Sequence, residues 1–125
     1  MTDPDSPTSA DALPPLPTGW VLARVTGPSM SPTVRHGDRL LVRRLPTGGT
    51  APPGAVVLAR FPARPDLLVV KRVRRDVPGG VWVEGDNPGV ADDSRAFGTA
   101  VAVGLVVLRL WPHPGPLPAA PDPPL

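Results

Sequence analysis

Prolines divide this chain into a foldable middle and two ends that are poorly suited to folding. Of its 21 prolines, five lie in residues 1–18 and seven lie in residues 112–125. All 13 lysines and arginines lie between these ends, which carry only acidic charge. Proline-rich, charged segments bury too little apolar surface to fold. The pattern predicts a disordered acidic arm over 1–18, one folded domain over 19–111 and a disordered tail over 112–125.

The middle of the chain has the pattern of short strands. Runs rich in valine and leucine alternate with turn-forming Gly, Pro and Asp residues. The predicted strands are 20–25, 39–44, 55–61, 67–75, 81–84 and 100–110. No segment has a convincing helical period, and at most one turn of helix fits, near 31–34. Closely spaced strands without helices predict a mainly β fold, a small barrel or a coiled antiparallel sheet.

Composition excludes several kinds of site. The chain has no cysteine, so it has no disulfide, no thiolate metal site and no cysteine nucleophile. Its two histidines, His36 and His113, are far apart and too few for an ordinary zinc site. The longest apolar run, 100–108, is too short for a membrane span, which needs about 20 residues. The acidic, proline-rich start does not resemble a secretory leader. We therefore expect no metal, no cofactor, no membrane partner and a cytoplasmic location.

One lysine stands among twelve arginines. A coding bias toward arginine explains the twelve but not the retention of Lys71, because an arginine cannot lose its proton. Alternation along 67–75 puts Lys71 in an apolar row with Leu67, Val69 and Val73. Burial there would lower the pKa of the amine, by up to about 3–5 units, and a neutral amine is a general base. The alternative is a lysine that reaches along apolar neighbours to water.

A serine that such a base could activate is Ser29. It lies in the segment 26–33, TGPSMSPT, where one glycine and two prolines predict a sharp turn directly after the first strand. A serine hydroxyl is a poor nucleophile until a base accepts its proton, and a lysine is one such base. The alternative is an ordinary turn serine.

Three segments together resemble a known family. Residues 27–33 (GPSMSPT) resemble the S-M-x-P-T box of type I signal peptidases, and residues 70–73 (VKRV) resemble their lysine box. Residues 85–88 (GDNP) and 93–98 (DSRAFG) resemble their third box. The resemblance implies a β-rich Ser/Lys endopeptidase with the signal-peptidase-like or repressor-protease-like fold. It implies Ser29 as nucleophile, the Ser29 N–H as an oxyanion donor and Lys71 as general base.

The same resemblance implies supporting roles for residues in the three boxes. These residues are Gly27, Met30, Pro32, Arg72, Asp86, Asn87, Asp93, Ser94 and Arg95. We expect two structural ion pairs, one between Asp86 and Arg72 and one between Asp93 and Arg95. The chain also departs from the family. Gly27 stands where a second oxyanion hydroxyl is frequent, and Ala91 stands where a serine commonly binds the lysine amine. Ser94 is a possible substitute for that serine.

The small size of the domain further resembles the soluble proteases that mature nickel-type superoxide dismutase. This implies a partner, a precursor protein with an N-terminal leader, and the nickel superoxide dismutase precursor is the expected one. Neither nucleic acid nor a membrane is expected to bind.

Three alternatives stay open. A self-cleaving repressor-type Ser/Lys protease shares part of the boxes, although the chain has no Ala-Gly or Cys-Gly bond to cut. A non-enzymatic basic barrel that binds nucleic acid is compatible with the arginines at 43–44 and 72–75. A histidine-dependent serine hydrolase would use His36.

Overall fold

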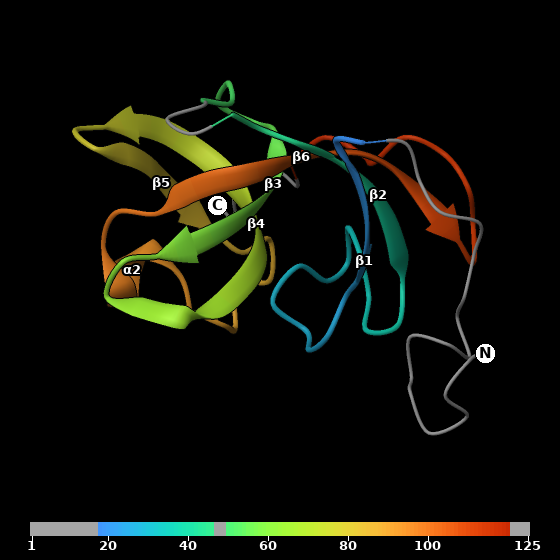
Figure 1. The fold of residues 1–125 in the computed structure, drawn as a ribbon. Helices are drawn as coiled ribbons and strands as arrows, with labels where there is room; N and C mark the ends of the chain where they lie inside the picture. The colour runs from blue at the N-terminus through green and yellow to red at the C-terminus, as the bar shows by residue number, and fades with distance from the viewer. Residues whose placement is uncertain (1–17, 47–49, 121–125) are drawn as a thin grey trace.

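The computed structural model describes residues 18–46 and 50–120. These residues form strands and one short helix (Figure 1). The elements are β1 (Trp20–Arg24), β2 (Arg39–Arg44), β3 (Val56–Phe61), β4 (Arg64–Val77), β5 (Gly80–Glu84), α2 (Ser94–Phe97) and β6 (Val101–Trp111). The predicted mainly β class is confirmed.

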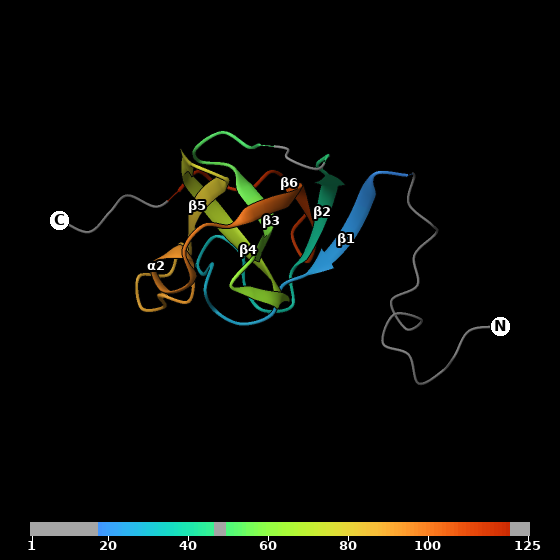
Figure 2. The ribbon, with the colours of Figure 1, turned by 60° about the vertical axis from the view of Figure 1, so that its left-hand side comes forward.

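The strands form one antiparallel sheet in the order β1-β2-β6-β3-β4-β5. The sheet is open and strongly curled, so it is a coiled sheet and not a closed barrel (Figure 2). β5 pairs only with the second half of β4, from Arg72 onward. The first half of β4, residues 64–71, therefore has β3 on one side and no strand on the other. The terminal strands β1 and β5 are the outer edges of the sheet, and β5 is bridged at Val81 to Ala100.

Two clusters of buried side chains form the core. One lies between β3, β4, β5 and β6 and includes Phe61 and Val73. The other lies between β1, β2 and the segment that follows β1, and includes Leu40, Val42 and Met30. The alternation of buried and half-buried residues along β2 is the period of two that a strand with one buried face requires. Met30 ties the predicted nucleophile segment to the second cluster.

β4 is longer than the predicted strand and contains Pro65, which we expected to be a breaker. A proline is tolerated in this position because residues 64–71 lie at a sheet edge. The pairing with β3 is also already irregular between Arg60 and Phe61. The Pro65 carbonyl accepts a hydrogen bond from Arg60 Nη1 at 2.8 Å.

The helical turn expected near 31–34 is present only as a hydrogen-bonded turn, in which Val34 N donates to Met30 O at 3.1 Å. The helix of the described residues is α2, which periodicity did not predict because it has only four residues. The residues that mark this helix in the sequence are its two caps. The Asp93 side chain caps the first turn by accepting from Arg95 N, and Gly98 ends the helix with a positive φ.

The packed chain continues beyond residue 111, where we expected the domain to end. Arg109 and Gly115 form an antiparallel bridge, and Leu117 packs against the cluster that contains Met30. Arg72 Nη2 donates to the Pro118 carbonyl at 3.2 Å. We call residues 112–118 the C-terminal strap. Residues 1–17 of the predicted arm over 1–18, and residues 121–125 of the predicted tail, lie outside the described residues.

Within residues 18–46 and 50–120, we find no helix with the length and apolar character needed to cross a membrane.

Truncation of the chain after Trp111 is expected to lower the free energy of unfolding by about 1–3 kcal/mol, because it removes an acceptor of a buried guanidinium and the Leu117 contact. Urea denaturation of this truncation and of a control truncated after Ala120 measures the difference. The control should unfold like the full chain. Equal midpoints for the two truncations would mean that the strap does not stabilise the domain.

Candidate active site

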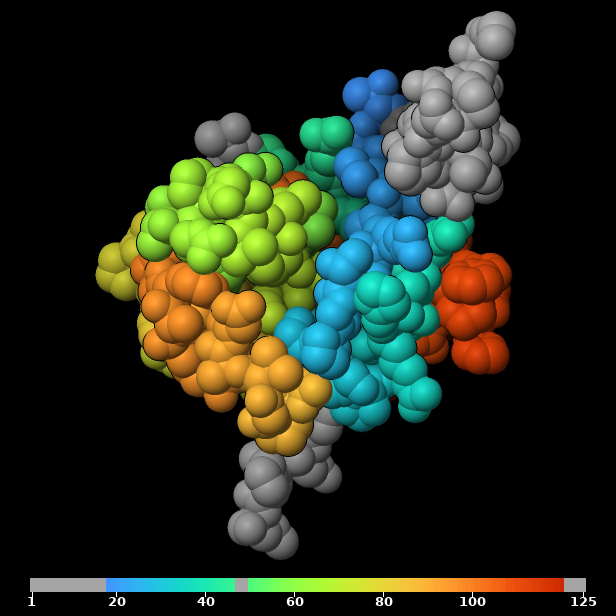
Figure 3. All heavy atoms as spheres, turned by 90° about the horizontal axis from the view of Figure 1, so that it is seen from below, coloured from blue at the N-terminus to red at the C-terminus, as the bar shows by residue number. Residues whose placement is uncertain are grey.

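A pocket of about 460 Å³ lies where the free edge of β4 faces β1 and the turn after it. Its walls are residues 21–30, Leu58, residues 67–71, and Val90 with Asp92. Figure 3 shows the molecule from this side, with the blue residues of β1 and the following turn opposite the green residues of β4. Most of the wall is aliphatic, and the reactive side chains gather at one end.

Ser29 lies at that end, in a turn closed by a hydrogen bond from Ser31 N to Pro28 O at 3.0 Å. Gly27 has a φ of +81°, a conformation that favours glycine. Met30 is only 1% exposed, so the residue next to Ser29 is anchored in the core. Pro32, which follows a cis peptide bond, is exposed. The buried Met30 thus holds the turn in place, and Ser29 lines the pocket.

The third box holds this turn from the other side. Asn87 Nδ2 donates to Pro28 O at 2.9 Å, and Asn87 N donates to Ser29 O at 3.0 Å. Gly85 lies directly against the Ser29 carbonyl, which a side chain at residue 85 would overlap. The glycine of the G-D-N box is therefore required for close backbone approach.

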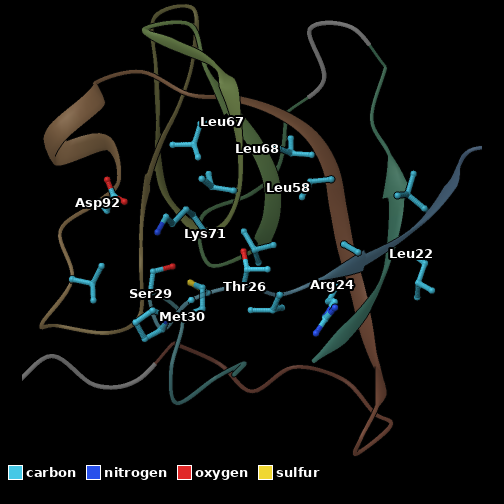
Figure 4. A pocket seen from close by; sticks show the side chains of 18 residues that line it. Leu22, Arg24, Thr26, Ser29, Met30, Leu58, Leu67, Leu68, Lys71 and Asp92 are labelled. Atoms are coloured by element: carbon cyan, nitrogen blue, oxygen red, sulfur yellow. The ribbon is translucent and has the colours of Figure 1, made fainter. Parts of the chain in front are cut away.

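Lys71 comes from the free half of β4 and is 2% exposed. Figure 4 shows its amine and the Ser29 hydroxyl at the same end of the pocket. Burial lowers the pKa of Lys71, and Arg95 adds to this effect, while the charges of Asp93 and Asp92 oppose it. The net pKa lies below the ordinary value for lysine. The amine is therefore easier to deprotonate than one in water.

Arg72, the next residue, forms a buried ion pair with Asp86. Its Nε and Nη2 donate to the carboxylate at 2.9 and 2.8 Å, and the two side chains are 3% and 0% exposed. Arg72 Nη1 donates to Gly54 O at 2.7 Å, and the Thr33 hydroxyl donates to Asp86. With the Pro118 contact, this network joins the turn after Ser29, β4, the third box and the C-terminal strap.

The second expected pair, Asp93 with Arg95, is also present. Arg95 Nη2 and Nε donate to the carboxylate at 2.7 and 3.0 Å, and Gly85 N donates to it at 2.8 Å. Burial by itself raises the pKa of Asp93, but these hydrogen bonds outweigh burial and the net pKa is lowered. Asp93 thus stays charged and is fully paired.

The hydroxyls and amides near Ser29 and Lys71 have distinct partners. Ser94 Oγ accepts from Val83 N at 2.9 Å, so it supports β5 and does not replace the missing partner of Lys71. The Gly27 N–H donates to His36 Nδ1 at 3.0 Å, which engages both groups. No described residue accepts a hydrogen bond from the Ser29 N–H. That amide is therefore free for a substrate oxygen, whereas the Gly27 amide is not.

Sequence reasoning did not single out Thr33, Gly85, Thr26 or Asp92. The first two belong to the recognised boxes, so the signal was present. Thr26 and Asp92 line the pocket beside Ser29 and Lys71, but nothing local in the sequence marks them. Among the residues that the structure describes, no group of three His, Asp or Glu side chains is arranged for a metal ion.

Comparison with known proteins gives a consistent result. The family described as Peptidase S24-like matches residues 8–107. The mitochondrial inner membrane protease subunit 1 of Xenopus tropicalis is 33% identical over 78% of this chain and 74% of its own length. The mitochondrial ATP-independent inner membrane protease subunit 1a of Arabidopsis thaliana is 36% identical over 70% of this chain and 68% of its own length.

Asp86→Asn is expected to lower the free energy of unfolding by about 3 kcal/mol, because it leaves the Arg72 guanidinium buried without a counter-charge. Thermal or urea unfolding measures this loss. Asp66→Asn, at an exposed ion pair with Arg64, is the matched control and should change stability by less than about 1 kcal/mol. Equal effects of the two substitutions would contradict the role assigned to the buried pair.

Proposed function

This chain belongs to the Peptidase S24-like family and is a peptidase, and we propose that it is a serine endopeptidase in which Ser29 is the nucleophile and Lys71 the general base. The observation that carries the proposal is the meeting of a buried amine and a turn serine at one end of one pocket. His36, the alternative base, is outside the pocket lining among the described residues, and its Nδ1 accepts a hydrogen bond from the Gly27 amide.

The reaction follows from these groups. The neutral amine of Lys71 accepts the Ser29 proton as the serine oxygen attacks the carbonyl carbon of the scissile bond. The Ser29 N–H donates to the oxyanion that forms. The ammonium of Lys71 then protonates the leaving amine, and the C–N bond breaks to leave an acyl-enzyme. A water molecule, deprotonated by Lys71, hydrolyses the ester and restores the serine.

The free edges suggest how a substrate binds. Residues 67–71 of β4 have unpaired backbone groups on the pocket side, and β1 forms the opposite wall. An extended peptide that adds to such an edge gains main-chain hydrogen bonds and places alternate side chains in the pocket. The aliphatic lining, which includes Val21, Ala23 and Leu58, suits small apolar side chains.

The proposed substrate is a precursor protein that loses an N-terminal leader. The nickel superoxide dismutase precursor is the specific candidate, and the sequence resemblance is its support. Two further expectations also stay predictions. The protein acts in the cytoplasm, and it binds neither a membrane nor a nucleic acid. Incubation of the purified chain with that precursor, followed by mass spectrometry of the new N-terminus, tests the candidate. If the precursor is not cut, it is not the substrate, and the proposal that the chain is a serine peptidase stands.

Ser29→Ala and Lys71→Met are each expected to lower the cleavage rate by about 10³-fold or more, because each removes half of the dyad. Lys71→Met should also raise the free energy of unfolding by about 1–2 kcal/mol, since it relieves the cost of a buried amine. Ser31→Ala is the control, two residues away and outside the pocket lining, and should cut normally. Cleavage by Ser29→Ala at the normal rate would remove Ser29 from the mechanism.

The rate should depend on pH through Lys71. The ammonium is inactive, so kcat/KM is expected to rise about tenfold per pH unit below the pKa of Lys71 and to level off above it. Because burial lowers that pKa, the plateau should begin below the pH at which an exposed lysine deprotonates. A pH–rate profile between pH 5 and 11 measures the midpoint. A midpoint at or above 10.5, the ordinary value, would contradict an activated amine.

A further inference from the structure

Asp92 lines the pocket at the same end as Ser29 and Lys71. Figure 4 shows its carboxylate on the loop opposite the Lys71 amine, and shows Arg24, another charged residue of the lining, on β1 far from Asp92. The remaining wall is largely aliphatic. A substrate side chain next to the cleaved bond therefore meets one carboxylate at this end of the pocket.

The charge of Asp92 is not cancelled by its neighbours. Asp93, the adjacent carboxylate, is buried and fully paired with Arg95. In contrast, the structure's described residues give the Asp92 side chain no hydrogen bond and no ion pair. Its charge acts on Lys71, but the proposed mechanism requires Lys71 to be neutral when the substrate is bound. In that state Asp92 carries the uncompensated charge at the reacting end.

Although Asp92 is exposed, its backbone is held on both sides. Arg95 Nη2 donates to the Val90 carbonyl at 3.1 Å, and Asp93 is held by Arg95 and Gly85. The Val90 N–H donates to the Asn87 carbonyl, and Asn87 binds the Ser29 turn. The backbone of Asp92 is thus held in place relative to the turn that carries Ser29, so its carboxylate stays at this end of the pocket.

We propose that Asp92 is a specificity-determining residue that selects substrates with a basic side chain, lysine or arginine, next to the scissile bond. The inference rests on the proposed function, because it needs cleavage at Ser29. A bound peptide excludes water from the pocket, which strengthens the attraction between a substrate cation and this carboxylate. An acidic side chain at the same place is repelled. The aliphatic walls provide affinity, and the carboxylate provides discrimination.

The test uses peptides with an Ala-Ala core in which one residue flanking the cleaved bond is Lys, Gln or Glu. The wild-type protein is expected to give a kcat/KM for the best Lys peptide about three- to tenfold above that for its Gln counterpart. Asp92→Asn should bring this ratio to about one, and Asp92→Lys should invert it in favour of Glu. Within one variant, both peptides are cleaved with the same Lys71. A change in proton transfer therefore alters both kcat/KM values alike and leaves their ratio unchanged. Asp76→Asn, an equal charge change outside the pocket lining, should keep the wild-type ratio.

Binding of the same peptides to Ser29→Ala, measured by fluorescence anisotropy, gives a second ratio that needs no cleavage. A Lys preference that Asp92→Asn abolishes in both measurements supports the proposal. A preference that survives Asp92→Asn, or its absence from the wild-type protein in both measurements, overturns it. Neither result touches the proposed function, which is tested separately by whether Ser29→Ala still cuts the peptides.

Discussion

The buried ion pair between Arg72 and Asp86 is the interaction on which the arrangement of the site depends. Two charges that are almost without solvent exposure are stable only when every donor and acceptor is satisfied. The guanidinium meets this condition by binding Asp86 and the carbonyls of Gly54 and Pro118, while Thr33 donates to the carboxylate. Five segments that are distant in sequence must therefore come together for the charges to be buried. The same requirement brings the third box against the turn that carries Ser29.

The pair also sets the direction of Lys71. Successive side chains of a strand point to opposite faces, so a strand that turns Arg72 toward Asp86 turns Lys71 the other way, into the pocket. One face of β4 thus carries an arginine that must be paired. The other carries Lys71, whose proposed role as general base requires that it lose its proton. The charge of nearby Asp93 raises the pKa of Lys71 and that of its partner Arg95 lowers it. Burial is left as the main influence on the Lys71 amine.

The strands were predictable because their signal is local. Runs of Val and Leu with a period of two, bounded by Gly and Pro, define β2, β3 and β5 to within about one residue. Prediction was less accurate where a tertiary contact overrides a local rule. Pro65 lies inside β4 because that part of the strand is an edge, and the proline-rich strap is ordered because a buried arginine needs the Pro118 carbonyl. Neither condition is visible in the residues themselves.

The sequence alone determined the class of fold, the boxes that contain Ser29 and Lys71, and the partners in the two ion pairs, because each depends on residue type and short spacing. Only the tertiary structure decided whether Lys71 is exposed or buried, that Ser94 binds Val83 rather than the amine, and that Asp92 is at the end of the pocket near Ser29 and Lys71. Solvent exposure and hydrogen bonding depend on which strands and loops come into contact, and those contacts join residues that no local pattern connects.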